Sequence, residues 1–596
     1  MREYTTPGEV ALPDNATLLH PLWYHADENP DRRLLAYRDG NRFVDVTAAE
    51  FADTVQRLAR GLIGLGLEID DRVAIMSKTR IEWTYLQYAV MAAGGTVVPI
   101  YETDSADQIE WILTDSGARI AVFGTPDDRR EWEQVSATAP LNHVFVIDEE
   151  GLDRIEESGT DVDADELDRR AERIGPESIA TIIYTSGTTG KPKGCVTLHR
   201  NLRWDAVQAT TALEELFGPD DRTLLFLPLA HSFAQLIQAG NVEVGVQMAY
   251  ATDPQQLAEE LPMFQPTFLL AVPRIFEKVY NAAVSRANEE GKGKIFERAV
   301  QVAIDYSRQG QGGGVSLATR IQHTVFDRLA YGKLRDRMGG KLRYAISGGA
   351  ALGERLGHFY NGIGLTILEG YGLTETTAGA TTNRPDALKI GTVGQPFPGC
   401  TVRVDDDGEV LIKGGNVFAG YWNNDEATQE AITDQGFFRT GDLGELDDDG
   451  FLRVTGRKKE LIVTAGGKNV APAVLEDRLR SHRLVSQSMV VGDGRPFIAA
   501  LITIDPEEFP RWAEQHGKTG KTVADLTDDR ELRAEIKSAV DHANQAVSRA
   551  ESIREFRILP EDFTIDGGEL TPTLKVKRRV VADKYGHVID DIYPEE

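Results

Sequence analysis

The chain has 596 residues, of which 41% are hydrophobic and 8% aromatic, and its formal net charge is −29. This composition excludes a disordered chain, and the length predicts several domain-sized units. The acidic balance argues against nucleic acid as a partner, because a nucleic-acid-binding surface needs a basic stripe, and it identifies no substrate.

The two cysteines, Cys195 and Cys400, exclude a disulfide framework, and neither has a neighbour at metal-ligand spacing. The N-terminus lacks the apolar stretch of a signal peptide. No run approaches the 18 apolar residues that predict a membrane-spanning helix. We therefore expect a cytoplasmic protein.

The first half of the chain alternates apolar strand patterns with helical ones. The pattern predicts helices at residues 79–93 and 105–115, and strands at residues 72–76, 96–100, 119–123 and 144–147. Such alternation predicts an α/β fold with a parallel, helix-covered sheet. The acidic segment at about 148–177 is predicted to be a solvated connection carrying a short helix.

Residues 184–194 carry the strongest functional signal, the run Tyr-Thr-Ser-Gly-Thr-Thr-Gly-Lys-Pro-Lys-Gly, which follows an apolar strand pattern at 179–184. Its glycines allow a close backbone approach, and its hydroxyls and lysines suit a polyphosphate. It is not a Walker-type loop, because Gly190-Lys191 is followed by Pro192. The alternative is a flexible surface loop.

The segment at 282–316 is polar and includes the glycine-rich stretch 309–314. This composition predicts a mobile surface excursion. From about residue 392 the pattern changes to alternating strands around Asp407-Gly408 and Asp449-Gly450, and Asp-Gly between alternating strands indicates a hairpin. We expect a small β-rich subdomain at about 392–455, followed by a smaller α/β unit.

Two further motifs combine glycines with an aromatic ring or a carboxylate. In Glu369-Gly-Tyr-Gly-Leu-Thr-Glu375 a purine can stack on Tyr371, and Glu375 can hold a hard cation. Upstream, Ser347-Gly-Gly-Ala350 offers another close backbone approach. The alternative for the first motif is a turn before a helix with an acidic first turn.

Three more motifs lie towards the C-terminus. In Arg439-Thr-Gly-Asp442 the carboxylate can accept both hydroxyls of a ribose. Arg457 lies in Gly456-Arg-Lys-Lys-Glu460, and Lys575 lies in the Pro-constrained basic segment 570–579. Alone, the last two would be read as a solvated charge run and a solubilising tail.

In this order, and with Pro228-Leu-Ala-His231 between them, these motifs closely resemble the adenylate-forming (AMP-binding) superfamily. The resemblance covers nearly the whole chain. It is nearest to bacterial long-chain fatty-acid–CoA ligases, on the segments 461–472 and 567–575. Thr573-Leu574 stand before Lys575 where the superfamily usually has Ser-Gly, so Lys577 stays a rival for the catalytic lysine.

The resemblance implies a fold and a reaction. The fold is a large N-terminal AMP-binding domain, residues 1–457, of two α/β lobes plus a small β-barrel. A smaller, mobile C-terminal α+β domain, residues 458–596, is joined at a hinge at Lys459. The reaction is ATP-dependent activation of a fatty acid to an acyl-adenylate, followed by transfer to coenzyme A with release of AMP.

The resemblance also assigns roles to residues. Thr185 and Glu375 would hold Mg²⁺, and Lys575, Glu375, Thr185 and His231 would serve the chemistry, His231 by lining the acyl pocket. Coenzyme A would meet Gly466, Gly467, Lys468 and Asn469. ATP would be bound by Thr185, Ser186, Gly187, Thr188, Thr189, Gly190, Lys193, Gly348, Gly349, Ala350, Glu369, Gly370, Tyr371, Gly372, Thr374, Asp442 and Arg457.

Several questions stay open at this point. A fatty-acyl-AMP ligase that loads a carrier protein and a non-catalytic nucleotide sensor are the other readings, and for His231 the alternative is a core or capping histidine. The sequence does not define the acyl chain length or the oligomeric state. Weak peripheral contact with the inner face of a membrane is open too, although we see no basic amphipathic helix and the net charge opposes anionic lipid.

Overall fold

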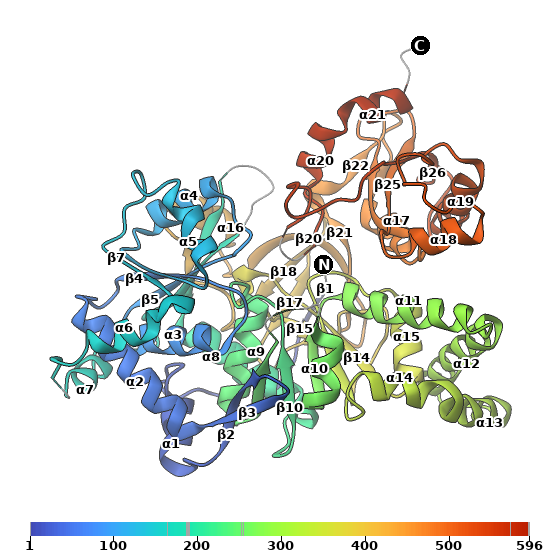
Figure 1. Cartoon of the computed structure of the whole chain (residues 1–596). Helices are drawn as coiled ribbons and strands as arrows, with labels where there is room; N and C mark the ends of the chain where they lie inside the picture. Colours follow the sequence, from blue (N-terminus) through green and yellow to red (C-terminus); the bar gives the residue numbers. More distant parts are fainter. Residues whose placement is uncertain are drawn as a thin grey trace.

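The computed structural model describes residues 2–163, 165–185, 191–251, 253, 256–571 and 574–593. A large N-terminal body carries a smaller C-terminal unit, drawn in orange and red, at one end (Figure 1). Ser186–Gly190, the middle of the predicted phosphate loop, lie outside the described residues. In the part of the chain that the structure describes, no helix combines the length and apolarity needed to cross a bilayer.

The N-terminal sheet has the strand order β19-β9-β8-β5-β4-β6-β7. Strands β4 to β8 pair in parallel, whereas β9 is antiparallel to β8, so the predicted parallel sheet is confirmed. Its strands are β4 (Arg72–Met76), β5 (Thr96–Ile100), β6 (Ile120–Phe123), β7 (His143–Val146), β8 (Ile179–Thr185), β9 (Lys193–Leu198) and β19 (Gly420–Tyr421).

The helices beside this sheet also follow the sequence pattern. The predicted helices at 79–93 and 105–115 are α3 (Ile81–Ala92) and α4 (Ala106–Ser116), and the acidic connection carries two short helices, α6 (Gly151–Glu157) and α7 (Glu166–Ala171). The others in the first half are α1 (His20–Glu28), α2 (Ala48–Gly64), α5 (Pro126–Glu133), α8 (His199–Ala212), α9 (Ser232–Val244) and α10 (Leu257–Phe264).

The middle sheet has the order β16-β15-β14-β13-β12-β10-β11-β2-β3. Its central strands β10 to β14 are parallel, and hairpins close both edges. The strands are β2 (Arg33–Asp39), β3 (Arg42–Thr47), β10 (Arg222–Leu225), β11 (Gln247–Tyr250), β12 (Phe268–Ala271), β13 (Tyr344–Ser347), β14 (Thr366–Tyr371), β15 (Thr381–Thr382) and β16 (Gln395–Pro396).

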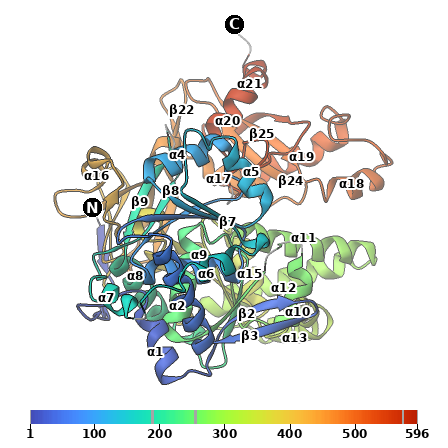
Figure 2. The same ribbon diagram turned by 60° about the vertical axis from the view of Figure 1, so that its left-hand side comes forward.

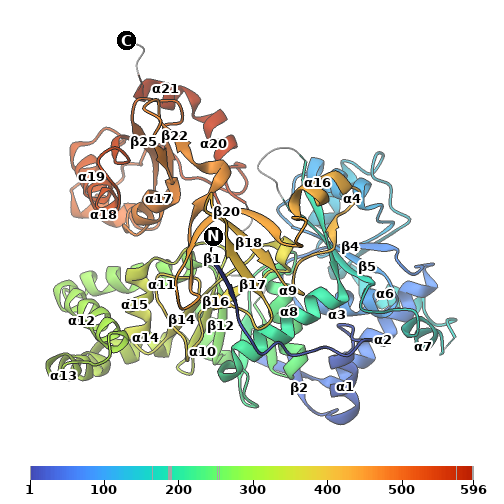
Figure 3. The same cartoon turned by 180° about the vertical axis from the view of Figure 1, so that it is seen from behind.

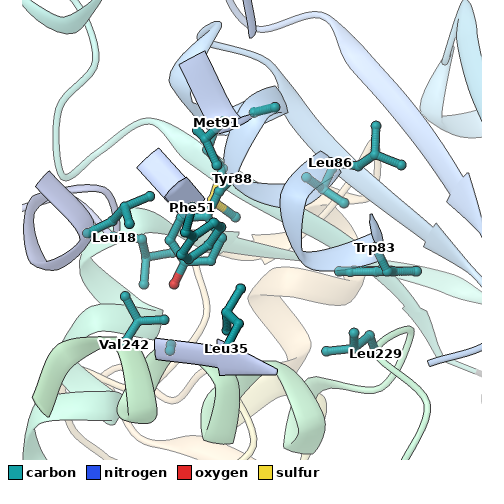
Figure 4. Close-up of a cluster of buried hydrophobic side chains, with 14 of the residues drawn as sticks. Leu18, Leu35, Phe51, Trp83, Leu86, Tyr88, Met91, Leu229 and Val242 are labelled. Atoms are coloured by element: carbon teal, nitrogen blue, oxygen red, sulfur yellow. The ribbon is translucent and has the colours of Figure 1, made fainter. Parts of the chain in front are cut away.

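One hydrophobic core joins these two sheets through the helices between them (Figure 4). Phe51 of α2 meets Tyr88 of α3 edge-on, with ring centroids 5.2 Å apart. Leu35 of β2 and Val242 of α9 belong to the same buried cluster. Because both sheets share this core, the two α/β lobes form one body, and the edges of their strands keep a fixed relation.

The prediction of a mobile excursion at 282–316 is wrong. Most of the segment lies in α11 (Pro273–Glu289) and α12 (Gly293–Gln311). It ends at the N-cap of α13 (Leu317–Phe326), which continues into the π-helical turn η4 (Asp327–Tyr331). In α12, Ala299, Val300 and Ala303 are buried, and the helix packs against α15 (Glu354–Gly362). The buried positions recur at helical spacing within a polar composition, so the composition concealed them.

The antiparallel sheet has the order β1-β17-β18-β20-β21 and corresponds to the small barrel expected from the resemblance. Both predicted hairpins are confirmed, since Gly408 and Gly450 turn at φ +85° and +84° between paired strands. The N-terminal strand joins from the far end of the chain, as Figure 3 shows from behind. The strands are β1 (Arg2–Thr5), β17 (Thr401–Val404), β18 (Glu409–Lys413), β20 (Phe438–Leu446) and β21 (Leu452–Arg457).

The C-terminal unit follows the short 3₁₀ turn η6 (Lys458–Glu460), which contains the predicted hinge residue. Its sheet has the order β24-β25-β26, with a buried core on the side of α17 and α19. The elements are β22 (Ile462–Val463), β23 (Asn469–Val470), α17 (Pro472–Arg480), β24 (Val485–Val491), β25 (Ile498–Ile504), α18 (Phe509–Gln515), α19 (Arg530–Asn544), β26 (Ile553–Ile558), α20 (Arg578–Lys584) and α21 (Gly586–Ile592).

Candidate active site

A cavity of about 1930 Å³ opens between the N-terminal body and the C-terminal unit. Its wall includes the carboxyl ends of β8, β13 and β14, which is where open parallel sheets bind ligands. Among the residues that the structure describes, sixteen of the predicted site residues line it: Thr185, Lys193, His231, Gly348, Gly349, Ala350, Glu369, Gly370, Tyr371, Gly372, Thr374, Glu375, Asp442, Arg457, Lys459 and Lys575.

Glycine-rich turns follow two neighbouring strands in this wall. Strands β13 and β14 pair in parallel with Ser347 opposite Glu369, so the turns after them lie side by side. Gly349 has φ +83°, and a Cβ on Gly372 would lie 2.0 Å from the carbonyl oxygen of Ala378. Glycine is therefore required there, and the bare backbone leaves room for a flat ring.

Asp442, on the antiparallel sheet, contacts two other predicted site residues, Arg457 and Tyr371. It lies opposite Arg457 in the β20–β21 pairing, and the Arg457 Nε is 2.9 Å from its Oδ1. The hydroxyl of Tyr371 donates to Oδ2 at 2.6 Å. Burial opposes the charged guanidinium, but Asp442 holds the pKa of Arg457 above its ordinary value. The carboxylate is thus fixed, with lone pairs left to accept ribose hydroxyls.

Glu369 is a buried carboxyl group in the same wall. Its Oε1 accepts a hydrogen bond from the backbone N–H of Leu352 at 3.0 Å, which holds the turn after β13. Burial raises the pKa of Glu369 to about 7, and the charge of Asp477 on α17 adds to the shift. Its role here is to shape the glycine-rich turn.

The phosphate-loop region forms a hairpin, because Thr185 at the end of β8 is paired with Lys193 at the start of β9. On neighbouring β19, Tyr421 donates its hydroxyl to Glu375 Oε1 at 2.9 Å, and the Lys193 Nζ lies 4.8 Å from the centre of the Tyr421 ring. Tyr421 therefore orients both a predicted cation ligand and a predicted phosphate ligand. No motif in the sequence pointed to Tyr421.

Lys575 reaches into the cavity from the C-terminal unit. The side chain stays accessible to solvent, but the protein walls around it lower the pKa of its ammonium, and the charge of Arg457 lowers it further. Burial likewise lowers the pKa of His231 to about 4, with a contribution from Lys575, so this imidazole is neutral at physiological pH. The His231 Nδ1 accepts from the N–H of Phe233 at 3.1 Å, which makes it the N-cap of α9 as well as a cavity residue. The rival Lys577 lines the cavity too. Burial raises the pKa of Asp104 to about 6, and the charge of Lys577 opposes this rise.

The predicted coenzyme A loop is not brought to the cavity. Gly466, Gly467 and Lys468 lie in the turn between β22 and β23, Asn469 begins β23, and the four residues are exposed. The Lys468 Nζ pairs with Glu551 of the same unit at 3.2 Å. Their role in coenzyme A binding stays a prediction, which needs another orientation of the C-terminal unit.

Helix α11 holds the C-terminal unit in the present orientation. Arg274 forms an ion pair with Asp505 at 2.8 Å, and both side chains are largely buried. About one turn further on, Lys278 pairs with Glu507 at 3.0 Å. About three turns after Arg274, the Ser285 hydroxyl donates to Glu508 at 2.7 Å. These contacts depend on the orientation in which Lys575 enters the cavity. Sequence reasoning missed them, since nothing local links the two segments.

Known proteins of the same fold include the A domain of a carboxylic acid reductase from Segniliparus rugosus in complex with AMP and a co-purified carboxylic acid. It has a TM-score of 0.75 and 20% identity over 97% of this chain and 94% of that one. The anthranilate CoA ligase AuaEII, in complex with anthranoyl-AMP, gives a TM-score of 0.72 and 21% identity over 96% and 98% of the two chains.

Closer relatives are found by sequence. The chain is 50% identical over 601 residues, all of both chains, to the long-chain-fatty-acid–CoA ligase FadD15 of Mycobacterium bovis. It is 30% identical to the long-chain-fatty-acid–CoA ligase ACSBG2 of Xenopus laevis, over 94% of this chain and 81% of that one. Residues 22–422 match the AMP-binding enzyme family and residues 459–596 the AMP-binding enzyme C-terminal domain. The chain belongs to the AMP-binding enzyme family.

Proposed function

We propose that this chain is a long-chain fatty-acid–CoA ligase, which converts a fatty acid, ATP and coenzyme A to acyl-CoA, AMP and pyrophosphate. The observation that carries the proposal is that Lys575 of the C-terminal unit lines the same cavity as Asp442, Arg457 and Tyr371 of the N-terminal body. Full-length identity of 50% to a ligase of this kind supports it. We place the domain boundary after Arg457, directly before the η6 turn.

In the first half-reaction the adenine would lie against Tyr371 in the glycine-rich slot, and Asp442 would accept the ribose hydroxyls. Residues 185–190 and Lys193 would hold the β- and γ-phosphates. A carboxylate oxygen of the fatty acid would then attack the α-phosphorus, the bond to pyrophosphate breaks, and the acyl-adenylate forms. The ammonium of Lys575 would balance the charge that moves between these oxygens.

Mg²⁺ fits the donor set of this wall. Glu375 and Thr185 supply hard oxygen ligands at the edge of the cavity, and Mg²⁺ in phosphate-handling sites uses one or two protein oxygens with the phosphates of the substrate. When bound, the ion would neutralise phosphate charge. Tyr421, which donates to Glu375, would keep that carboxylate turned towards the phosphates.

In the second half-reaction the C-terminal domain would rotate at Lys459. This rotation would withdraw Lys575 and bring Gly466–Asn469 to the cavity. The thiol of coenzyme A would attack the acyl carbonyl carbon, and AMP would leave as the thioester forms. A loop with two glycines suits this task because little side-chain bulk obstructs the thin pantetheine arm.

The test is a pyrophosphate-release assay over fatty acids of increasing length, with and without free coenzyme A, combined with detection of acyl-CoA. We expect acyl-CoA to form with free coenzyme A. Adenylate formation that never yields acyl-CoA would instead support a fatty-acyl-AMP ligase that loads a carrier protein. If no acid causes pyrophosphate release, the result would support the alternative of a non-catalytic nucleotide sensor.

The first prediction concerns Lys193. Lys193→Ala should raise KM for ATP or lower kcat by roughly one to two powers of ten, because one charged phosphate contact of about 1.5–3 kcal/mol is lost. The side chain is exposed at the strand start, so the melting temperature without ATP should hardly change. Loss of folding with unaltered kinetics per folded molecule would contradict a phosphate role.

The second prediction concerns the α11 contacts. Arg274→Met removes the ion pair with Asp505 but keeps the packing of the side chain. Adenylate formation should slow by roughly three- to tenfold, because the adenylating orientation becomes less populated. Conversion of supplied acyl-adenylate and coenzyme A should not slow. Arg286→Met is the matched control, since Arg286 on the same helix pairs with Glu290 of the N-terminal body. Equal slowing by both variants would contradict the role of Arg274.

A further inference from the structure

Helix α13 exposes a continuous apolar stripe. Leu317, Ile321 and Val325 recur at every fourth residue, and Leu329 continues the row in the η4 turn. Their exposed fractions are 75%, 58%, 50% and 59%, although such side chains are usually buried. We call these four residues the α13 stripe. The opposite side of the helix packs inward, with His323 stacked on Tyr306 of α12 at 3.9 Å between ring centroids.

The stripe extends onto the neighbouring helix. Ile295 of α12 is 57% exposed and lies one turn before Arg298, whose guanidinium donates to Gln322 of α13 at 2.6 Å. In Figures 1, 2 and 3 α13 lies at the outer edge of the N-terminal body, away from the C-terminal unit. A projecting edge with an apolar face can touch a flat surface without hindrance from the rest of the molecule.

The charges around the stripe are basic, in contrast with the whole chain. Arg320 and Arg328 are exposed beside the apolar residues, and Lys333 follows one turn later. Helix α13 contains no aspartate or glutamate. The nearest acidic residue along the chain, Asp327, is held by Arg335 at 2.8 Å. A chain of net charge −29 thus presents an apolar stripe flanked mainly by basic groups, with the carboxylates Glu297 and Asp327 in the minority.

We propose that the α13 stripe is a docking surface for an anionic lipid bilayer. Interfacial helices combine an apolar face, buried at the headgroup boundary, with arginines or lysines that reach the lipid phosphates. The basic groups offset the repulsion that the net charge would cause, since the surface potential acts over a Debye length only.

Charge complementarity also decides against a second copy of this chain as the occupant. In a two-fold dimer the same patch meets itself, so the basic residues around the stripe of one copy would lie near those of the other. Helix α13 offers no carboxylate to pair them. A lipid phosphate supplies the missing negative charge, and the acyl chains cover the apolar residues.

The position of the stripe agrees with supply of an apolar substrate. Helix α13 follows α11 and α12 in the chain, and Val272, Pro273 and Glu277 at the N-terminal end of α11 line the cavity. This link rests on the proposed function, but the docking proposal does not, because lipid binding can be measured without ATP or fatty acid.

The test is co-sedimentation of the full chain with phosphatidylcholine vesicles, with and without phosphatidylglycerol, at low and high salt. The parent should bind the phosphatidylglycerol vesicles at low salt. Ile321→Glu should weaken this binding by roughly tenfold or more, because it places a charge in the apolar face. Tyr24→Glu is the matched control. It adds the same charge at an equally exposed aromatic residue of α1, 60% exposed, and should bind as the parent does.

Arg320→Gln combined with Arg328→Gln should remove most of the preference for phosphatidylglycerol. Ile321→Gln repeats the test without an added charge and should also weaken binding. The proposal is overturned if the parent binds neither vesicle, or if Ile321→Glu and Tyr24→Glu weaken binding equally. It is also overturned if light scattering shows a parent dimer that Ile321→Gln converts to monomer, because a second copy would then cover the stripe.

Discussion

Replacing Lys575 by alanine is expected to slow acyl-adenylate formation by roughly 10²–10³-fold, the usual loss when one preorganised charge donor is removed from a reacting centre. The side chain lies in the cavity beside Arg457 and within the field of Asp442. Its positive charge can therefore stabilise the negative charge as that charge shifts from the attacking carboxylate to the leaving pyrophosphate. The measurement is ATP–pyrophosphate exchange with a saturating fatty acid.

The second half-reaction supplies the control. Lys575→Ala should convert supplied acyl-adenylate and coenzyme A to acyl-CoA at nearly the parent rate, because Lys575 leaves the cavity before that step. Lys577→Ala should affect neither half strongly. Lys577 also lines the cavity, but its charge acts on Asp104, where it opposes the burial that raises the pKa of that carboxyl to about 6. If Lys577→Ala alone shows the adenylation defect, the catalytic lysine is displaced by two residues from our assignment.

The sequence could predict those parts of the fold that rest on local signals. Apolar runs such as 72–76 and 96–100 became neighbouring parallel strands, because runs buried on both faces are typical of such sheets. The turns at Asp407-Gly408 and Asp449-Gly450 were predictable since glycine is needed where φ is positive. The site motifs were predictable for the same reason, because close backbone approach leaves glycines at fixed spacing.

What could not be predicted depends on contacts between distant segments. Tyr421 reaches Glu375 and Lys193 only because β19 pairs with β9, more than 200 residues earlier in the chain. The strand β1 pairs with β17 across an even longer gap, since Thr5 lies opposite Thr401. The ion pair of Arg274 with Asp505 depends on how two units are oriented, which no local pattern records.

The segment 282–316 shows how composition can mislead. Its polar character and its glycines predicted an excursion, yet Ala299, Val300 and Ala303 are spaced to bury one side of a helix. Small apolar residues such as alanine raise the mean hydropathy of a segment only slightly, but they allow helices to pack closely. The same oversight concealed α13, whose apolar residues at every fourth position form a face that composition averages away.

Replacing Lys459 by proline is expected to suppress acyl-CoA formation by roughly a hundredfold or more while adenylate formation persists, if rotation at this residue gates the second half-reaction. Lys459 lies in the first turn of the 3₁₀ segment η6. Proline is tolerated in a first helical turn, and its φ near −65° suits a 3₁₀ turn. The substitution should therefore preserve the present orientation, with Lys575 in the cavity, and oppose the backbone change that a rotation requires.

Lys459→Ala separates the backbone from the side chain. It removes the ammonium but leaves φ free, so both half-reactions should stay within a few-fold of the parent, as expected where only one solvated charge is lost. Adenylate should accumulate on Lys459→Pro in a single-turnover experiment and decay to acyl-CoA on Lys459→Ala. Equal loss of both half-reactions in the proline variant would mean that the turn supports the site itself. Full acyl-CoA formation by that variant would place the hinge elsewhere.

The contacts of α11 with Asp505, Glu507 and Glu508 would break in any such rotation. Arg274→Met removes one of these contacts but does not free the backbone at residue 459. Combining it with Lys459→Pro should therefore leave the defect in thioester formation in place.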